Sequence, residues 1–146
     1  MQDYIIVNPD YAAMAAERLT GHGPLHDPGA RIRDIGPGTC DLHMPISPAI
    51  SQHAGFVHGG VIGALADAAG GFAAWTLLPG DHDVRTVEYK INFMRPASGA
   101  AILARARVIR PGRRLSVVQI DVDALDQTGK AKAVALMQQT ITAIAP

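Results

Sequence analysis

Apolar and polar positions change their spacing about halfway along the chain. In the first half they recur with a helical period: residues 9–19 predict an amphipathic helix, and residues 59–79 predict a long helix that is apolar on every side. From residues 84–95 onward they alternate one by one, as in half-buried strands. In that stretch Val87 and Tyr89 share one face, opposite the polar residues. The pattern predicts an α+β protein.

We expect six strands, two before the long helix and four after it. The turn sequences PASG, PGRR and DQTG separate the last four strands, which are therefore expected to form an antiparallel meander. A helix that is apolar on every side must be covered on every side. The sheet is thus expected to curl around it, while loops or another subunit cover the rest. Residues 20–30 are rich in Gly, Pro and His and predict a loop. The expected strands are 31–36, 39–45, 84–95, 101–110, 115–125 and 132–144.

Length and composition favour one globular domain, residues 1–146, in which residues 1–30 form an N-terminal extension that carries the first helix. Thirteen basic residues balance thirteen acidic ones, and this neutrality argues against a nucleic-acid-binding protein. The only cysteine, Cys40, excludes an internal disulfide and favours a reducing, cytoplasmic setting. Because Cys40 alternates with Leu42 and Met44, we interpret it as a packed strand residue and not as a nucleophile.

Neither a signal peptide nor a membrane span is expected. The first residues lack a basic segment followed by a long apolar one. Residues 59–79 are long enough to cross a bilayer, but Asp67 lies near their midpoint and no cluster of Lys or Arg flanks them. We interpret this segment as a helix in the core of a soluble protein.

The sequence His58-Gly59-Gly60 at the expected start of this helix has two interpretations. Backbone N–H groups in a first helical turn have no partner within the helix, and glycines leave them accessible, so they could hold a carbonyl oxygen or an oxyanion. Alternatively, the glycines only permit a tight turn into the helix. His58 could likewise polarise a substrate or cap local backbone groups. The residue types alone leave both pairs of alternatives open.

Asp67 is the only charged residue of the apolar helix. A carboxylate in such surroundings must be hydrogen-bonded, hydrated or functional, and the functional interpretation is a nucleophile or general base. Asp67 follows Gly60 by seven residues, so the two share a helix face and are about 10 Å apart along the axis. One small carbonyl group cannot touch both. A two-fold dimer with antiparallel helices would bring Asp67 of one copy to the helix start of the other.

Several familiar kinds of site have no signature in the sequence. The histidines show no zinc-ligand spacing, and there is no serine nucleophile elbow, phosphate-binding loop or dinucleotide fingerprint. The glycines of GGVIGALADAAGG lie within a helical pattern and do not connect a strand to a helix. We therefore expect neither a metal ion nor a redox cofactor.

The segments GFVHGGVIGALADAAGG, TVEYKINFMRPASG and RPGRR together resemble the hotdog-fold acyl-CoA thioesterases, in particular the PaaI-like subgroup related to phenylacetic acid degradation. The resemblance covers roughly residues 38–144. Its most specific feature is H-G-G separated from Asp by six residues and followed by a strand that ends in N-F-x-R-P. It implies an antiparallel sheet wrapped around one long helix. It also implies a homodimer with active sites between the subunits, often paired into a homotetramer.

The resemblance also implies roles for individual residues. Asp67 would be the nucleophile or general base that acts on the thioester. The amide of Gly59, at the helix start of the other subunit, would bind the thioester oxygen, with His58 beside it. Thr86 matches a hydroxyl residue that orients the attacking water, and Gln52 stands where relatives commonly carry Asn. The expected catalytic set is Asp67, His58, Gly59, Gln52 and Thr86.

An acyl-CoA is the substrate that this resemblance implies, hydrolysed to free CoA and a carboxylic acid. The expected substrate-binding residues are Gly60, Arg95, Arg113 and Arg114. The arginines suit phosphate oxygens, although each could also be a solvated turn residue. Aromatic side chains expected to face the acyl group between subunits are Phe56, Phe72 and Trp75. One alternative is a non-catalytic acyl-CoA binder in which Gln52 marks a weakened site. The other is an enoyl-CoA hydratase or dehydratase, against which a helical Asp argues.

Overall fold

The apolar run in the middle of the chain forms α3, Gly59–Trp75, in a computed structural model that describes residues 4–146. The first three residues of the expected N-terminal extension lie outside the described part. Ten of the seventeen residues of α3 are buried. The helix ends at Trp75 and not at residue 79 as the sequence predicts. Neither α3 nor any other helix within the described residues is long and apolar enough to cross a membrane.

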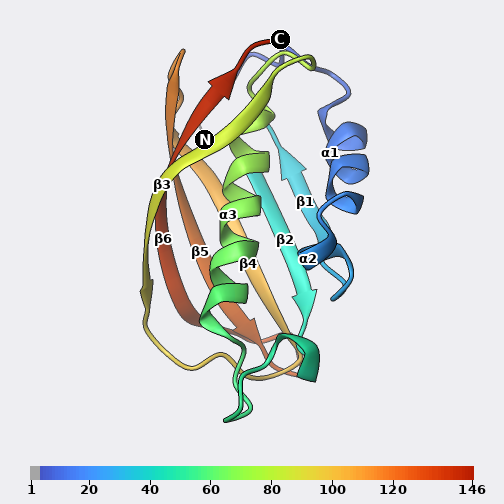
Figure 1. Ribbon diagram of the computed structural model, residues 1–146, viewed down its shortest axis with the longest axis vertical. Helices are drawn as coiled ribbons and strands as arrows, with labels where there is room; N and C mark the ends of the chain where they lie inside the picture. Colours follow the sequence, from blue (N-terminus) through green and yellow to red (C-terminus); the bar gives the residue numbers. More distant parts are fainter. Residues whose placement is uncertain (1–3) are drawn as a thin grey trace.

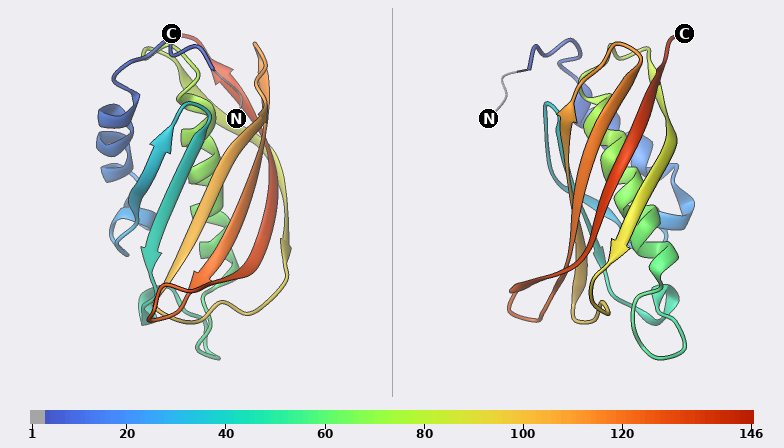
Figure 2. Two further views of the ribbon diagram at one scale, coloured as in Figure 1. Left: turned by 180° about the vertical axis from the view of Figure 1, so that it is seen from behind. Right: turned by 90° about the vertical axis from the view of Figure 1, so that its left-hand side faces the viewer.

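A six-stranded antiparallel sheet curls around α3, as Figures 1 and 2 show. Its strand order is β1-β2-β4-β5-β6-β3, and every neighbouring pair is antiparallel. One turn of 3-10 helix, η1 (Pro48–Ile50), precedes α3. This is the α+β class that the periodicity predicts and the hotdog arrangement that the resemblance implies. The strands are β1 (Arg31–Gly36), β2 (Thr39–Pro45), β3 (Asp83–Phe93), β4 (Ala101–Arg110), β5 (Leu115–Leu125) and β6 (Ala131–Ile144).

The expected four-stranded meander is wrong in one respect, because β3 does not lie beside β4. It pairs with β6 along its whole length, so only β4, β5 and β6 form a meander. Residues 94–100 carry the chain from the β3 edge of the sheet to its middle and do not form a hairpin turn. Ala97 in this segment is buried, and its carbonyl oxygen accepts a hydrogen bond from the Val57 N–H at 3.0 Å. Alternation identifies the two faces of a strand but not the strand beside it.

Strand β3 is largely exposed. Within residues 4–146 its edge away from β6 has no neighbouring strand. Val87, Tyr89 and Phe93 expose 55%, 45% and 54% of their surface. Large apolar side chains beside an unpaired strand edge are typical of a surface that another chain covers.

The N-terminal helix expected over residues 9–19 is α1, Tyr11–Thr20, which packs against β1. The segment 20–30 was expected to be a loop, but it contains a short second helix, α2, Gly23–His26. Pro24 favours this start because its missing N–H has no helical acceptor in a first turn. Figure 1 shows α1 and α2 beside β1, on the side of the sheet where α3 lies.

Cys40 on β2 is fully buried in the core, as the alternation with Leu42 and Met44 predicts. Burial, followed by the nearby carboxylates of Asp41 and Asp34, raises the pKa of its thiol to about 12. A thiol with so high a pKa carries almost no thiolate at neutral pH. The interpretation of Cys40 as a structural residue is therefore confirmed.

Candidate active site

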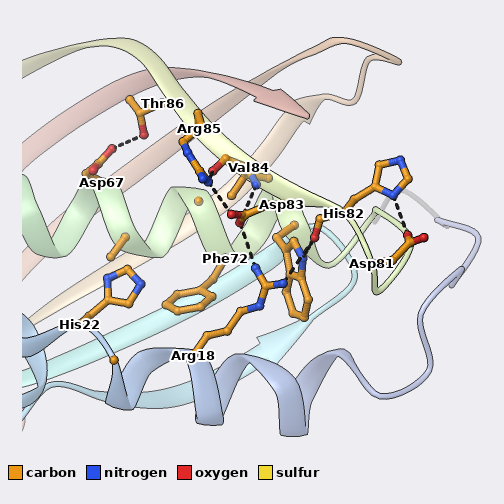
Figure 3. A pocket seen from close by; sticks show the side chains of 14 residues that line it. Arg18, His22, Asp67, Phe72, Asp81, His82, Asp83, Val84, Arg85 and Thr86 are labelled. Atoms are coloured by element: carbon orange, nitrogen blue, oxygen red, sulfur yellow. Dashed lines mark hydrogen bonds and ion pairs between the residues drawn. The ribbon is translucent and has the colours of Figure 1, made fainter. Parts of the chain in front are cut away.

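Asp67 lies near the middle of α3. Its carboxylate oxygen Oδ1 accepts a hydrogen bond from the Thr86 hydroxyl at 2.6 Å (Figure 3). The side-chain amide of Gln139 donates a second hydrogen bond to the same oxygen. Within residues 4–146 no Lys, Arg or His forms an ion pair with this carboxylate, and no hydrogen bond reaches its other oxygen, Oδ2. The carboxylate is thus held through one oxygen and leaves the other without a protein donor.

A bulge in β3 accompanies the contact between Thr86 and Asp67. The pairing of β3 with β6 shifts between Thr86 and Glu88, so that Thr86 opposes Ile141 and Glu88 opposes Thr140. A β-bulge re-aims the side chains beside it. The structure therefore brings together two residues that the resemblance implied. Their spacing of nineteen positions in the sequence does not by itself predict this contact.

Gln139 on β6 is the residue that the sequence analysis missed. It is fully buried, and its Nε2 donates to the Asp67 carboxylate, to the Asp67 main-chain oxygen at 3.2 Å and to Thr86 Oγ1 at 3.1 Å. Its Oε1 is buried without a partner among the described residues. A signal was present in the sequence, because Gln139 occupies an inward position between the buried Met137 and Ile141, where an apolar residue is expected.

The start of α3 is capped by His58. Its Nδ1 accepts a hydrogen bond from the Gly60 N–H at 2.9 Å, which shows the capping that was one of its two interpretations. The Gly60 amide is therefore engaged within its own chain. The Gly59 N–H, in contrast, has no acceptor within residues 4–146. Gly59 lies against the ring of Phe93, where an added Cβ would be 3.2 Å from Cζ.

Four of the five expected catalytic residues line two separate hollows in one chain, and His58 lines neither. Asp67 and Thr86 line a cavity of about 560 Å³. Gln52 and Gly59 line a second hollow of about 380 Å³, together with Arg95. Since Gly59 and Asp67 are eight positions apart in the helix, about 12 Å of helix axis lies between them. A single chain does not bring the two halves together.

The first cavity lies between α3, helix α1 with the residues that follow it, and the start of β3 (Figure 3). Phe72 and Trp75 line it, and His22 contributes a ring 5.7 Å from that of Phe72. Arg18 of α1 lies over Trp75, with 4.3 Å between its guanidinium carbon and the ring centre. The Phe56 side chain, which was expected beside Phe72, lines the second hollow instead.

Charged groups fix the outer end of this cavity. Asp83 accepts hydrogen bonds from Arg18 at 3.0 Å and from Arg85 at 2.5 Å. The hydrogen bond from Arg85 is the main cause that lowers the pKa of Asp83, with smaller contributions from the Val84 N–H and the charge on Arg18. Arg18 therefore ties α1 to both α3 and β3.

The three expected phosphate-binding arginines lie at opposite ends of the sheet. Arg95 follows the end of β3, where its guanidinium donates to the Ala133 carbonyl oxygen at 3.0 Å. Arg113 and Arg114 lie in the turn between β4 and β5, beside the opposite end of β6, as the hydrogen bond from the Ala143 N–H to the Arg114 carbonyl oxygen shows. No group of three or more His, Cys, Asp or Glu within residues 4–146 could hold a metal ion.

Similar proteins are found by sequence and by structure. The family model of the thioesterase superfamily matches residues 54–131, a range that includes Asp67 and Thr86 but neither α1 nor Gln139. A curated protein of Halobacterium salinarum with the name "Putative esterase" is 32% identical over 128 residues, which are 84% of this chain and 84% of that protein.

Solved structures extend this similarity to the whole fold. The crystal structure of a thioesterase family protein from Silicibacter pomeroyi is 35% identical, with a TM-score of 0.88, and the match covers 93% of this chain and 99% of that one. The PaaI protein from the phenylacetic acid degradation operon of E. coli shares the fold, with a TM-score of 0.79 at 21% identity over 97% of each chain.

Proposed function

Because this chain belongs to the thioesterase superfamily and is a thioester hydrolase, we propose that it hydrolyses an acyl-CoA to free CoA and a carboxylic acid. One observation supports a catalytic role for Asp67 above all others. Its Oδ1 is held by Thr86 and Gln139, while Oδ2 has no donor within the described residues, beside a cavity large enough for an acyl group.

In this proposal Asp67 Oδ2 carries the chemistry by one of two routes. As a general base it takes a proton from water while the water oxygen attacks the thioester carbon. As a nucleophile it bonds to that carbon itself and expels the thiolate, and water then attacks the same acyl carbon of the mixed anhydride and releases Asp67 as the carboxylate. In both routes the carbon–sulfur bond breaks, the acid gains its oxygen from water, and the departing thiolate takes up the proton. Neither route needs a metal ion or a redox cofactor.

The oxygen of the thioester would be held by a second copy of the chain. Gly59 offers an N–H that has no acceptor within residues 4–146, but it is about 12 Å along the helix from Asp67 of its own chain. A two-fold dimer with antiparallel α3 helices would bring Gly59 of one copy to Asp67 of the other. The exposed apolar side chains of β3 supply a surface for such pairing. Association of two such dimers into a tetramer remains a prediction from the resemblance.

In this dimer each of the two hollows would bind a different part of the acyl-CoA. We expect the acyl group in the cavity beside Asp67, against Phe72 and Trp75. The CoA portion would extend toward the second hollow of the other copy, where Arg95 is available to phosphate oxygens. Since Arg113 and Arg114 lie at the other end of their own chain, antiparallel pairing would bring them toward the Arg95 of the other copy.

Release of thiol from a panel of acyl-CoAs, with the Asp67→Asn variant beside the wild type, tests this proposal. We expect turnover to fall by about 100- to 10,000-fold in Asp67→Asn, since general bases contribute factors of this size. Asp27→Asn is the control, because Asp27 is an exposed carboxylate outside both hollows and its loss should change nothing.

Three other results would change the assignment. Unchanged hydrolysis by Asp67→Asn would refute the role of Asp67. Binding of acyl-CoA without thiol release would favour a non-catalytic binding protein, the alternative suggested by Gln52. Addition of water to an enoyl-CoA would favour a hydratase.

A further inference from the structure

Gln139 is buried in a place where an apolar side chain would be expected. It exposes none of its surface, and on β6 it lies between the buried Met137 and Ile141. Burying an amide is unfavourable unless its polar atoms find partners. The Nε2 of Gln139 has partners, but its Oε1 has none within the described residues. The core therefore carries an incompletely satisfied polar side chain directly behind Asp67.

The partners of Nε2 all belong to the proposed catalytic pair. They are Asp67 Oδ1, the Asp67 main-chain oxygen at 3.2 Å and Thr86 Oγ1 at 3.1 Å. A glutamine amide has two N–H donors, so these three acceptors use its full donor capacity. The Thr86 hydroxyl accepts from Gln139 and donates to Asp67 Oδ1 at 2.6 Å. Gln139 thus sets the direction of the Thr86 hydroxyl as well as holding the carboxylate.

A glycine in α3 makes room for this amide. A Cβ at position 70 would lie 1.8 Å from Gln139 Oε1 and 3.0 Å from its Cδ. Any other residue at position 70 would push the amide away from Asp67. Gly70 and Gln139 are therefore complementary, although they are 69 positions apart in the sequence.

We propose that Gln139 is a positioning residue that anchors Asp67 Oδ1 and leaves Oδ2 as the reacting oxygen, and that Gly70 provides the space for its amide. The inference rests on the proposed function, since it assigns a role within that site. The anchor keeps the carboxylate in one rotamer and turns Oδ2 toward the cavity. It also prevents Thr86 from donating its proton elsewhere.

Gln139→Met tests the anchor because methionine has similar length and volume but donates no hydrogen bond. We expect kcat to fall by about 10- to 100-fold, the usual effect of losing a hydrogen bond to a charged group. KM should change little, because Gln139 does not reach the cavity and its contacts with substrate are indirect. Gln138→Met is the matched control, since the neighbouring Gln138 is exposed on the other face of β6.

Two further variants keep the test independent of any folding defect caused by methionine at position 139. Gly70→Ala should lower kcat in the same way, because the added Cβ displaces the amide without changing Gln139 itself. Gln139→Glu places two carboxyl groups face to face, so one of them binds a proton more readily and then acts as a donor. The activity of Gln139→Glu relative to the wild type should therefore rise as the pH is lowered from about 7 to about 5. The relative activity of Gln139→Met should not rise over this pH range.

The outcomes separate this inference from the proposed function. If Asp67→Asn is inactive and Gln139→Met is folded with the kcat of the wild type, only the anchor is refuted. If Gln139→Met does not fold, a Gln139→Glu variant whose relative activity stays constant with pH refutes the anchor equally well. If Asp67→Asn retains its activity, the proposed function itself fails.

Discussion

Replacing Gly59 by proline would remove one backbone N–H and little else. Gly59 is the first residue of α3, a position where proline is favoured because its fixed φ suits the helix. The preceding residue, His58, has φ −62° and ψ 131°, which is the extended geometry required before proline. The added Cβ would lie 3.2 Å from Phe93 Cζ, so the ring must move by a few tenths of an ångström.

The size of the effect follows from the role proposed for this amide. Loss of one donor to an oxyanion lowers kcat by about 100- to 1,000-fold, or roughly 2.7–4 kcal/mol. The stability of the fold should change little, because the Gly59 N–H has no acceptor within the described residues. We therefore expect Gly59→Pro to lose turnover and to keep the melting temperature of the wild type.

Thiol release at saturating acyl-CoA, together with a thermal melt, measures both quantities. Gly59→Ala is the matched control, since it places the same Cβ beside Phe93 but keeps the N–H. It should retain most of the activity. A Gly59→Pro variant with the kcat of the wild type would refute the role of this amide. An equal loss in Gly59→Ala would assign the effect to the contact with Phe93.

Two further predictions concern the dimer and the N-terminal helix. Co-refolding of Asp67→Asn with Gly59→Pro should restore about a quarter of the wild-type activity. Random pairing makes half of the dimers mixed, and each mixed dimer has one intact site, built from the unchanged Asp67 of one copy and the unchanged Gly59 of the other. A mixture as inactive as its components would contradict a shared site. Asp83→Asn should lower the melting temperature at about pH 7, where the carboxylate is ionised and bonded to Arg85 and Arg18. Because the pKa of Asp83 is lowered in the folded state, this stabilisation is present above the ordinary Asp pKa and is lost as the pH falls through the lowered value. The difference in melting temperature should thus narrow as the pH falls below the ordinary Asp pKa, and a difference that stays constant would contradict the ion pair.

Local spacing predicted the elements of this fold but not all of their neighbours. The alternation in β3 and the apolar run of α3 depend on nearby residues, so the strand and the helix could be recognised from the sequence. The partner of β3 depends on the path of residues 94–100, and a turn sequence such as PASG is compatible with either a hairpin or a crossing. The short helix α2 was missed because Gly and Pro favour both loops and helix starts.

The residues of the candidate site differ in the same way: some can be recognised from nearby sequence, and others only from the tertiary fold. Asp67 was recognised because a charge within an apolar helix is unusual wherever the helix lies. Thr86 entered through the resemblance alone, since only the tertiary fold shows its contact with Asp67. Gln139 was missed although a polar residue at an inward strand position is also unusual. Glutamine is uncharged and is often exposed, so its sequence context is a weaker signal than that of an aspartate.

Gly70 has a consequence for attempts to make this protein more heat-resistant. Replacement of helical glycines by alanine is a standard route to higher stability, with a gain of about 0.4–1 kcal/mol at a compatible site. At position 70 the new methyl group would collide with Gln139, so the substitution would disturb the packing beside Asp67 and, under the proposed anchoring role, lower kcat. Gly70 should therefore be kept in any such redesign of α3, although alanine is the better helix former.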